Sequence, residues 1–583
     1  MATPATPAIA QTTGPLEGLR LEGSGPPGPA EALVAEHLRL LGAETVGGSG
    51  GRFTLTGRDV GEVTARTTWG EAATDEATTQ AATGIMAVHG RRDGSPRGLA
   101  VDYAATVTGV LAVQGLLAAL LARARGGGHI AQVEVSAERA GLLAVSQYLA
   151  AAGAEEGEAA ELAPGGPPFT SADGTVFELE TLDPGVWAAF WRALDAPQEA
   201  IRRGWRPFQF RYATACAPFP QALDEAARAS SWERIRHAAD SSGADVCPLR
   251  SLAERAAEYD GSAPWELTPH HTPHHTTYSP TRATDGLPLA GFTVLEAGRR
   301  IQAPLTAHLL GLLGAEVIRI EPPGGDPLRG MPPACSGISA RWLALNRGKK
   351  AVEVDIKSAA DRERLREMAA DADVFLHNWA PGKAAQLGLD HEHLAAASPA
   401  LVYAYTSGWA DRLPDAPMGT DFMVQARTGV GEAVRPADEP PAPSLMTLLD
   451  VLGGLLGAEA ITAALLLRER SSSGVRVDSS LLGAADVLTA PARARAVQGL
   501  DPRRPAGFRR PLRTADGWIA LADHSALPYD VAELSTGQAL KRLRDRGLAG
   551  VPVVTDLAGL LSSGPISRDA HGAPAVPTPW SFV

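Results

Sequence analysis

The chain has 583 residues, of which 45% are hydrophobic and 20% charged, a composition typical of folded protein. Its net charge of −13, with no long Lys/Arg run, argues against nucleic acid or an anionic membrane as a partner. Three cysteines, none in a Cys-x-x-Cys pair, exclude a disulfide scaffold and a cysteine zinc site. The N-terminus has no basic segment followed by an apolar one, so we expect no secretory signal and a cytoplasmic location.

The first half begins with an apolar, helix-like stretch at 32–45, which is followed by a short block at 76–84. The segment from Thr106 to Ala122 is strongly apolar but short for a membrane span, so we expect a buried helix. A strand at 132–136, a strand pair at 169–180 and a long Trp-rich helical stretch at 184–259 follow.

The second half alternates short strands rich in β-branched residues with helices. We expect strands at 292–298, 315–322, 349–357, 373–378 and 400–408, and helices at 301–314 and 358–371. This alternation predicts an α/β fold with a Rossmann-like parallel sheet.

The two halves contain similar blocks. EATTQAATG at 76–84 matches DFMVQARTG at 421–429, and the apolar helix at 109–125 matches that at 454–470, both at an offset of 345 residues. Fifty positions without a gap predict an internal duplication, whose two degenerate copies form a pseudo-dimer within one chain.

This organisation predicts six segments, each large domain being followed by a smaller α+β domain. They are a flexible tail (1–25), a degenerate partial large domain (26–155), its small domain (156–262), a Pro/Thr/His-rich linker (263–286), a complete large domain (287–500), and a shortened small domain with a C-terminal return segment (501–583). The linker contains His270, His271, His274 and His275, which we expect to lie in a flexible segment and not to bind a metal.

Seven strings follow one another in the second half. They are AEVIRIEPPGGDPLR (315–329), LNRGKKAVEVDIK (345–357), HNWAPGKAAQLGLD (377–390), TSGWA (406–410), GTDFMVQARTG (419–429), the helix led by Asp450, and SSSGVRVDSS (471–480). In this order they resemble family III CoA-transferases, the CaiB/BaiF-like group that includes formyl-CoA and carnitine CoA-transferases and 2-methylacyl-CoA racemases. That family forms interlocked dimers, which a fused pseudo-dimer would imitate; further homodimerisation stays open.

The resemblance implies that Asp450 is the nucleophile, four residues before Gly454 at the start of an apolar helix. Its carboxylate would attack an acyl-CoA thioester and pass coenzyme A to a carboxylic acid through covalent intermediates. The corresponding position in the first copy is Ala105, so that copy is predicted to be inactive. An alternative alignment with a three-residue gap would restore Asp102, but nothing else requires that gap.

The racemase branch places a proton-transferring His where this chain has Thr420, which favours a transferase. The resemblance implies that Lys349, Asn378 and Trp379 bind coenzyme A, together with the loop residues Gln302 and Ala303. Two arginines usual in the family are replaced by Ala380 and Gln386. Arg299 and Arg300 precede the loop residues Gln302 and Ala303, and three roles stay open for them: they replace lost phosphate contacts, they bind a carboxylate substrate, or they are solvent-facing loop charges.

Two alternatives stay open at the level of sequence. One is an acyl-CoA isomerase or lyase in which Asp450 is a general base. The other is a non-catalytic ligand-binding or scaffold protein, which the lost arginines and the inactive copy would suit.

Overall fold

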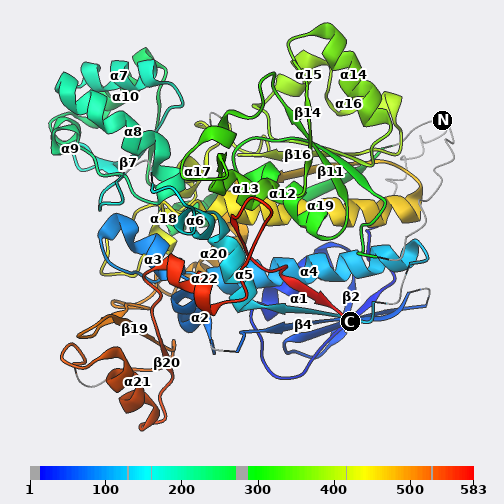
Figure 1. Cartoon of the computed structure of the whole chain (residues 1–583), viewed down its shortest axis with the longest axis horizontal. Helices are drawn as coiled ribbons and strands as arrows, with labels where there is room; N and C mark the ends of the chain where they lie inside the picture. The colour runs from blue at the N-terminus through cyan, green and yellow to red at the C-terminus, as the bar shows by residue number, and fades with distance from the viewer. Residues whose placement is uncertain are drawn as a thin grey trace, which may run out of the picture.

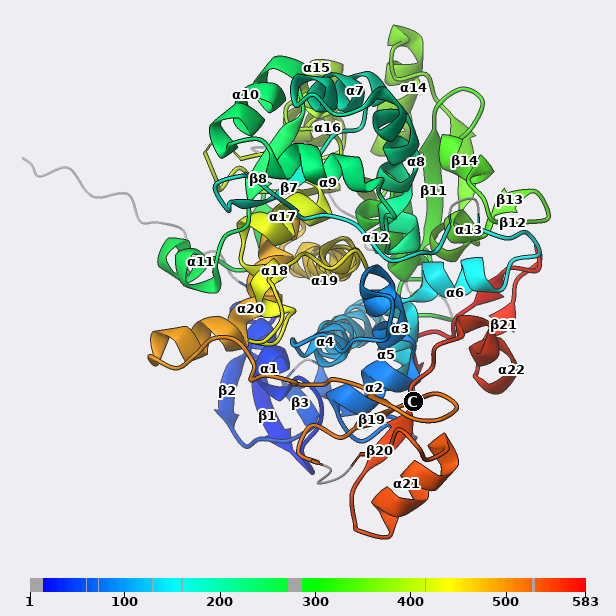
Figure 2. The same cartoon turned by 90° about the vertical axis from the view of Figure 1, so that its left-hand side faces the viewer.

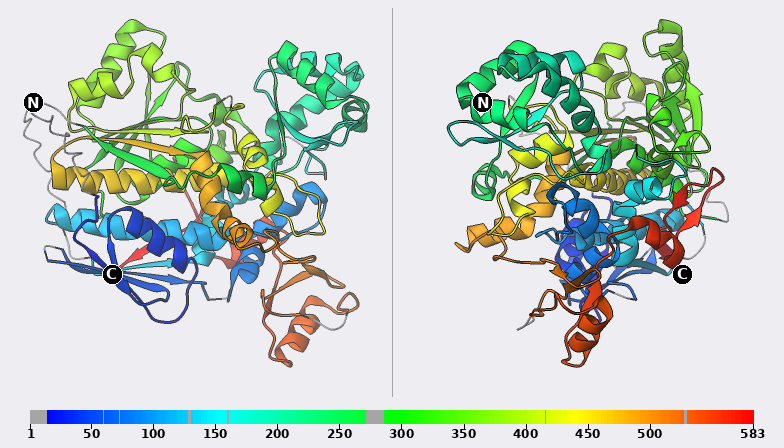
Figure 3. Two further views of the ribbon diagram at one scale, coloured as in Figure 1. Left: turned by 180° about the vertical axis from the view of Figure 1, so that it is seen from behind. Right: turned by 60° about the vertical axis from the view of Figure 1, so that its left-hand side comes forward.

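The computed structural model describes residues 14–58, 60–71, 73–127, 130–158, 161–270, 286–414, 416–526 and 530–583. Two sheets lie on either side of a pair of long helices, α4 (Tyr103–Ala124) and α19 (Leu448–Ser471), which run side by side through the centre of the molecule (Figures 1 and 3). The Tyr103 hydroxyl donates to the Leu448 carbonyl at 2.9 Å, and the Gln114 amide donates to the Leu455 carbonyl at 2.6 Å. The helix predicted around Thr106–Ala122 is therefore confirmed as a core helix.

Both central helices are long and apolar enough to cross a membrane by length and composition alone. In the structure the most apolar windows of α4 and α19 are 100% and 94% buried inside the protein. Their composition is accounted for by the contact between the two halves.

The second half builds the predicted Rossmann-like sheet. Its seven strands have the order β14-β11-β10-β15-β16-β17-β9, and all neighbours except the last pair are parallel. The strands are β10 (Thr293–Ala297), β11 (Glu316–Glu321), β14 (Lys350–Glu353), β15 (Val374–His377), β16 (Val402–Ser407), β17 (Val475–Ser480) and β9 (Trp265–Pro269). The helices of this domain are α12 (Gln302–Leu312), α13 (Ala340–Asn346), α14 (Ala359–Ala370), α15 (Lys383–Leu387), α16 (His391–Ala397), α17 (Asp421–Arg427), α18 (Val430–Ala433) and α20 (Leu481–Val497).

The first half keeps a reduced version of this sheet, in the order β2-β1-β3-β4-β5-β23. Its strands are β1 (Arg20–Ser24), β2 (Glu44–Gly47), β3 (Arg52–Gly57), β4 (Gly61–Thr68), β5 (Gln132–Ser136) and β23 (Trp580–Phe582). The remaining helices are α1 (Glu31–Leu40), α2 (Glu76–Ala82), α3 (Ile85–His89), α5 (Ala137–Ala144) and α6 (Ser146–Ala152). The antiparallel hairpin β3–β4 stands between β1 and β5, so this sheet is mixed and not parallel.

Each half ends in the sheet of the other half. β9, which closes the first half, pairs antiparallel with β17 of the second half, and β23, at the end of the chain, pairs antiparallel with β5 of the first half. Trp265 and Trp580 begin these two strands and are both buried. The exchange supports the prediction of an interlocked pseudo-dimer.

The two small domains are exchanged in the same way. The first consists of β6 (Phe169–Thr170), β7 (Val176–Glu180), α7 (Pro184–Ala193), α8 (Gln198–Thr214), α9 (Gln221–Arg228), α10 (Trp232–Ser242), β8 (Asp245–Pro248) and α11 (Leu252–Glu258), and it packs on α17 of the second half. The second consists of β18 (Leu512–Arg513), β19 (Trp518–Leu521), α21 (Thr536–Arg544), β20 (Gly550–Pro552) and α22 (Leu560–Ser563), and its strands contact α2 of the first half. Figure 2 shows the two small domains at opposite ends of the molecule.

Two predicted boundaries are wrong. The expected tail, 1–25, contains β1, whose few apolar residues and flanking glycines and prolines hide the strand in the sequence; Leu21 is nevertheless buried. The expected linker, 263–286, contains β9, which is ordered by its pairing with β17. His271, His274 and His275 lie outside the described residues.

Candidate active site

Asp450 lies in the first turn of α19 and is half-buried at the wall of a cavity. The turn is held from outside the helix, because no side chain of α19 caps it. Instead, Asp421 Oδ2 accepts hydrogen bonds from the backbone N–H groups of Leu449 and Asp450, each at 2.7 Å. The preceding residue, Thr447, has a φ of +43°, which is uncommon for a β-branched residue and is typical of functional sites.

The glycines after Asp450 serve helix packing. A Cβ on Gly453 would come within 2.9 Å of the Gln302 side-chain amide, and one on Gly454 within 2.9 Å of the Gln302 carbonyl. Their small size therefore brings α12 against α19 and places Gln302 beside Asp450.

The electrostatics around Asp450 favour the protonated acid. Burial and the neighbouring Asp421 raise the pKa of Asp450, the Arg300 guanidinium opposes them, and the net pKa is about 8. Burial also raises the pKa of Asp421 to about 6, against the hydrogen bonds that Asp421 accepts from Gln425 and from the backbone. Two coupled acids with raised pKa values in one cleft are typical of catalytic sites.

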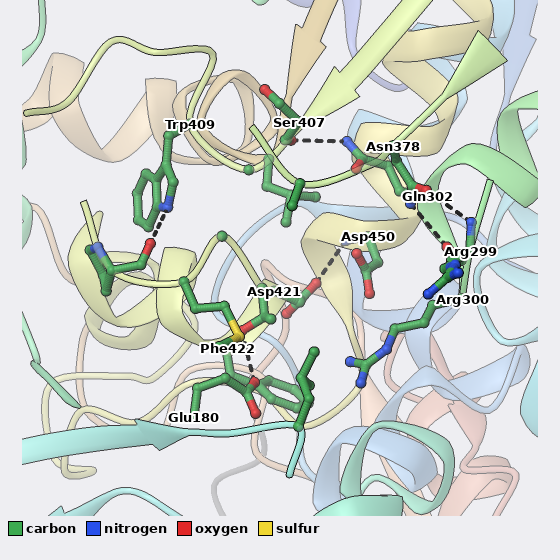
Figure 4. A pocket seen from close by; sticks show the side chains of 18 of the residues that line it. Glu180, Arg299, Arg300, Gln302, Asn378, Ser407, Trp409, Asp421, Phe422 and Asp450 are labelled. Atoms are coloured by element: carbon green, nitrogen blue, oxygen red, sulfur yellow. Dashed lines mark hydrogen bonds between the residues drawn. The ribbon is translucent and has the colours of Figure 1, made fainter. Parts of the chain in front are cut away.

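The cavity has a volume of about 670 Å³ and lies between the carboxyl ends of the second-half strands and the small domain of the first half (Figure 4). The second half contributes the loop at 299–300, Asn378 to Pro381, the segment from Tyr405 to Asp411, and Asp450. The first half contributes Glu180, Leu182, Trp205, Gln209, Arg211 and Tyr212. The first half therefore forms one wall of the cavity.

Five of the predicted binding residues line this cavity: Arg299, Arg300, Gln302, Asn378 and Trp379. The side chain of Asn378 is bonded to the backbone of the neighbouring loop. Its side-chain amide accepts the Arg299 N–H at 2.8 Å and donates to the Arg299 carbonyl at 2.9 Å, which holds the loop in place.

Ala303 and Lys349 do not line the cavity. Ala303 is fully buried in α12. The Lys349 ammonium donates to Glu296 Oε2 at 2.8 Å, to the Pro304 carbonyl at 2.7 Å and to Asn346 Oδ1 at 2.9 Å. An ammonium has three donors, so this lysine is fully occupied and would have to break a buried ion pair to reach a phosphate.

Sequence reasoning missed four residues of the site. Asp421 lies in the string GTDFMVQARTG (419–429), and Glu76 stands 345 residues before it in the first half. An acid at the same position of both copies was the sequence signal that could have identified Asp421. Glu180, Arg211 and Tyr212 come from the small domain of the other half, and no local pattern marks them. Thr420 donates to Glu180 Oε2 at 2.8 Å, and Arg211 pairs with Glu180 at 3.0 Å.

The first half reproduces the scaffold without the acid. Glu76 accepts the backbone N–H groups of Ala104 and Ala105, each at 2.8 Å, as Asp421 does for Leu449 and Asp450. These bonds pair Ala105 with Asp450 at the 345-residue offset, and they exclude the gapped alignment to Asp102. Asp102 instead forms an ion pair with Arg509 at 2.5 Å.

Arg509 lies at the start of α4 and is held there by several polar contacts. Its guanidinium is 2% exposed, and it also binds Asp523 at 2.7 Å and the carbonyls of Leu99 and Val101. Among the described residues, no group of three or more His, Cys, Asp or Glu side chains is arranged to hold a metal ion.

The comparisons with known proteins identify the family. The model of CoA-transferase family III matches the chain twice, over residues 65–285 and 289–532. This chain belongs to CoA-transferase family III. The two separate matches also support the predicted duplication.

Several curated relatives share sequence with part of this family III chain. The mouse succinyl-CoA:glutarate CoA-transferase is 35% identical over 198 residues, which are 33% of this chain and 45% of that protein. The Acetobacter aceti acetyl-CoA:oxalate CoA-transferase is 36% identical over 197 residues, 33% of this chain and 51% of that protein. The chain thus spans about half the length of these relatives.

A similar solved structure is that of a CAIB/BAIF family protein from Brucella suis. It is 25% identical, with a TM-score of 0.44, and the alignment covers 50% of this chain and 91% of that one.

Proposed function

We propose that this family III protein transfers coenzyme A from an acyl-CoA to a carboxylic acid through a covalent intermediate on Asp450. The observation that carries the proposal is the placement of Asp450. Its backbone is anchored by Asp421, and its carboxyl group borders a cavity large enough for the acyl end of a thioester. The relatives named as CoA-transferases support the same class of reaction.

The chemistry begins with the Asp450 carboxylate attacking the thioester carbonyl. The C–S bond breaks, coenzyme A leaves as the thiolate, and a mixed anhydride forms. The thiolate then attacks the Asp450 carbonyl of the anhydride, which releases the first acid and leaves an aspartyl thioester. An acceptor carboxylate attacks that thioester, the C–S bond breaks, and a second mixed anhydride forms between Asp450 and the acceptor. The released thiolate attacks the acceptor carbonyl of this anhydride, which gives the acceptor acyl-CoA and regenerates the Asp450 carboxylate.

The residues around Asp450 have separable roles in this scheme. Asp421 keeps the first turn of α19 in position. Arg300 favours the ionised nucleophile, because its charge lowers the pKa that burial raises. Trp379 offers an apolar surface to the pantetheine arm. Arg299, which lies next to Arg300 on another loop, is a cation available to a phosphate.

The proposal is tested by intact-protein mass spectrometry after incubation with a panel of acyl-CoAs, followed by trapping with hydroxylamine or borohydride. We expect a mass change that disappears in Asp450→Asn. No adduct with any acyl-CoA, together with no binding of coenzyme A by calorimetry, would overturn the proposal in favour of a non-catalytic role.

A second candidate is an acyl-CoA isomerase or lyase in which Asp450 is a general base. The raised pKa of Asp450 favours it, since an efficient base has a pKa near the operating pH. A racemase with the usual His is excluded, because Thr420 occupies that position and its hydroxyl is bound to Glu180. Solvent deuterium incorporation into an acyl-CoA without any acceptor acid would identify the general-base reaction.

A further inference from the structure

Several acidic side chains and few cationic ones surround Asp450 in the cavity, and one of the cations is already in an ion pair. Asp421 and Glu180 lie beside Asp450, and Arg211 is 4% exposed and already paired with Glu180. In contrast, no hydrogen bond or ion pair joins the Arg300 guanidinium to another residue in the part of the chain that the structure describes. Figure 4 shows its side chain extending into the cavity toward Asp450.

The position of Arg300 is specified by both halves of the molecule. Its backbone adopts a left-handed conformation with a φ of +62°, which is uncommon for an arginine and persists only where the surroundings impose it. The amide of Asn378 holds the preceding residue from both sides. The guanidinium then lies over the ring of Tyr212, 5.4 Å from its centre, and Tyr212 comes from the first half.

A cation in this location meets the acyl end of the substrate and not the nucleotide end of coenzyme A. While the thiol is at Asp450, the pantetheine arm keeps the phosphates of the same molecule away from it. The reacting carboxylate loses its charge when the anhydride or thioester forms. A carboxylate that stays charged throughout the reaction is the group that an unpaired guanidinium retains best.

Building on the proposed function, we propose that Arg300 is a specificity-determining residue that binds the non-reacting carboxylate of a dicarboxylic acid. The acids accepted by this site are then those whose second carboxylate reaches Arg300 while the first meets Asp450. Tyr212 is a positioning residue for the guanidinium.

The test compares acids that differ only in the second carboxylate, succinate against propionate and glutarate against butyrate, with acetyl-CoA as donor. We expect the wild type to prefer the dicarboxylic acid of each pair. Arg300→Gln should lower kcat/KM for both acids of a pair, because Arg300 also favours the ionised Asp450. It should lower kcat/KM for the dicarboxylic acid about 10- to 100-fold more than for the monocarboxylic acid, and this additional loss should appear mainly in KM. Arg300→Lys should recover part of the loss, because it keeps the charge without the planar fork.

The matched control is Arg299→Gln, which removes the adjacent cation of the same loop. It should affect the two acids of a pair alike. If Arg300→Gln lowers kcat/KM equally for both acids, Arg300 acts on Asp450 and the specificity role is wrong.

A failure of the proposed function would look different, since no acid would then accept coenzyme A. In that case calorimetric binding of succinate and glutarate to the wild type and to Arg300→Gln decides the matter. Binding that is lost only in the variant supports the anion site, and equal or absent binding overturns it.

Discussion

The starts of α19 and α4 are built by the same hydrogen bonds, but the position that holds Asp450 in α19 holds Ala105 in α4. In each half an acid binds the two N–H groups of the first helical turn, Asp421 in one and Glu76 in the other. In each half a glutamine supports that acid and joins it to a backbone segment, Gln425 to Ser444 and Gln80 to Leu99. The scaffold of the helix start is therefore separable from its chemistry.

The difference lies in what occupies the space in front of each helix. Before α19 there is an open cavity, and within the described ranges no hydrogen bond or ion pair joins the Arg300 side chain on its wall to another residue. Before α4 the buried Arg509 is tied to Asp102 and Asp523, and the residue in place of Asp450 is Ala105. The first half therefore has no acid at the position that matches Asp450, while its small domain supplies a wall of the cavity beside Asp450.

The largest expected effect comes from Asp450→Asn. Because the amide cannot attack a thioester, we expect CoA transfer to fall by about 10³-fold or more and the trapped adduct to disappear. Steady-state assays and intact-mass measurement check this. Residual transfer within tenfold of the wild type would contradict a covalent role.

The same substitution should stabilise the fold at alkaline pH. The folded-state pKa of Asp450, about 8, is raised above the ordinary value of 3.8, so ionisation of Asp450 opposes folding. This cost is absent below the unfolded pKa and grows as the pH rises toward the folded one. With one face of Asp450 open to the cavity, we expect Asp450→Asn to be more stable by about 1–2 kcal/mol at pH 8.5 and equal to the wild type near pH 4. Denaturant unfolding at the two pH values measures the difference.

The pH dependence of transfer follows from the same shift. Only the carboxylate is nucleophilic, so kcat/KM for the acyl-CoA should rise almost tenfold per pH unit below the Asp450 pKa of about 8 and level off above it. A flat profile between pH 6 and 9 would show that Asp450 is already ionised in the free protein.

Asp421 should act through Asp450. Asp421→Asn removes a neighbouring negative charge and weakens the anchoring of Leu449 and Asp450, so we expect transfer to fall about 10- to 30-fold and the pH profile to move to lower pH. Asp421→Glu should recover much of the rate, because Glu76 makes the same two bonds in the first half. A loss of rate without a shift of the pH profile would indicate a purely structural role.

The smallest effect on activity is expected from restoring the missing acid. Ala105 is 7% exposed, and the buried Arg509 at the start of the same helix is already paired with Asp102. Ala105→Asp should therefore create no second adduct by intact mass and should cost about 1–3 kcal/mol of stability, the penalty of burying another polar group. A second covalent adduct would show that the first half retains a usable site. Ala105→Ser, which adds a small polar group without a carboxylate, serves as the control.

The sequence by itself determined the family resemblance, the alternation of the second half and the identity of the nucleophile candidate. These are local patterns: strands and helices follow from hydrophobic periodicity, and the 345-residue offset pairs Asp450 with Ala105 without any structure. The hydrogen bonds of Glu76 and Asp421 support this pairing, and the inactivity of the first copy stays a prediction.

Only the tertiary structure decided which residues surround Asp450. Lys349 lies in a string typical of the family, but its ammonium forms a buried ion pair with Glu296. Tyr212 and Glu180 reach the site from a domain more than two hundred residues away in the chain. The strands β9 and β23 are ordered by pairing with the opposite half, so their own composition predicts little. The physical reason is that burial and ion pairing depend on how the two halves pack together, and no window of sequence contains both partners of such a contact.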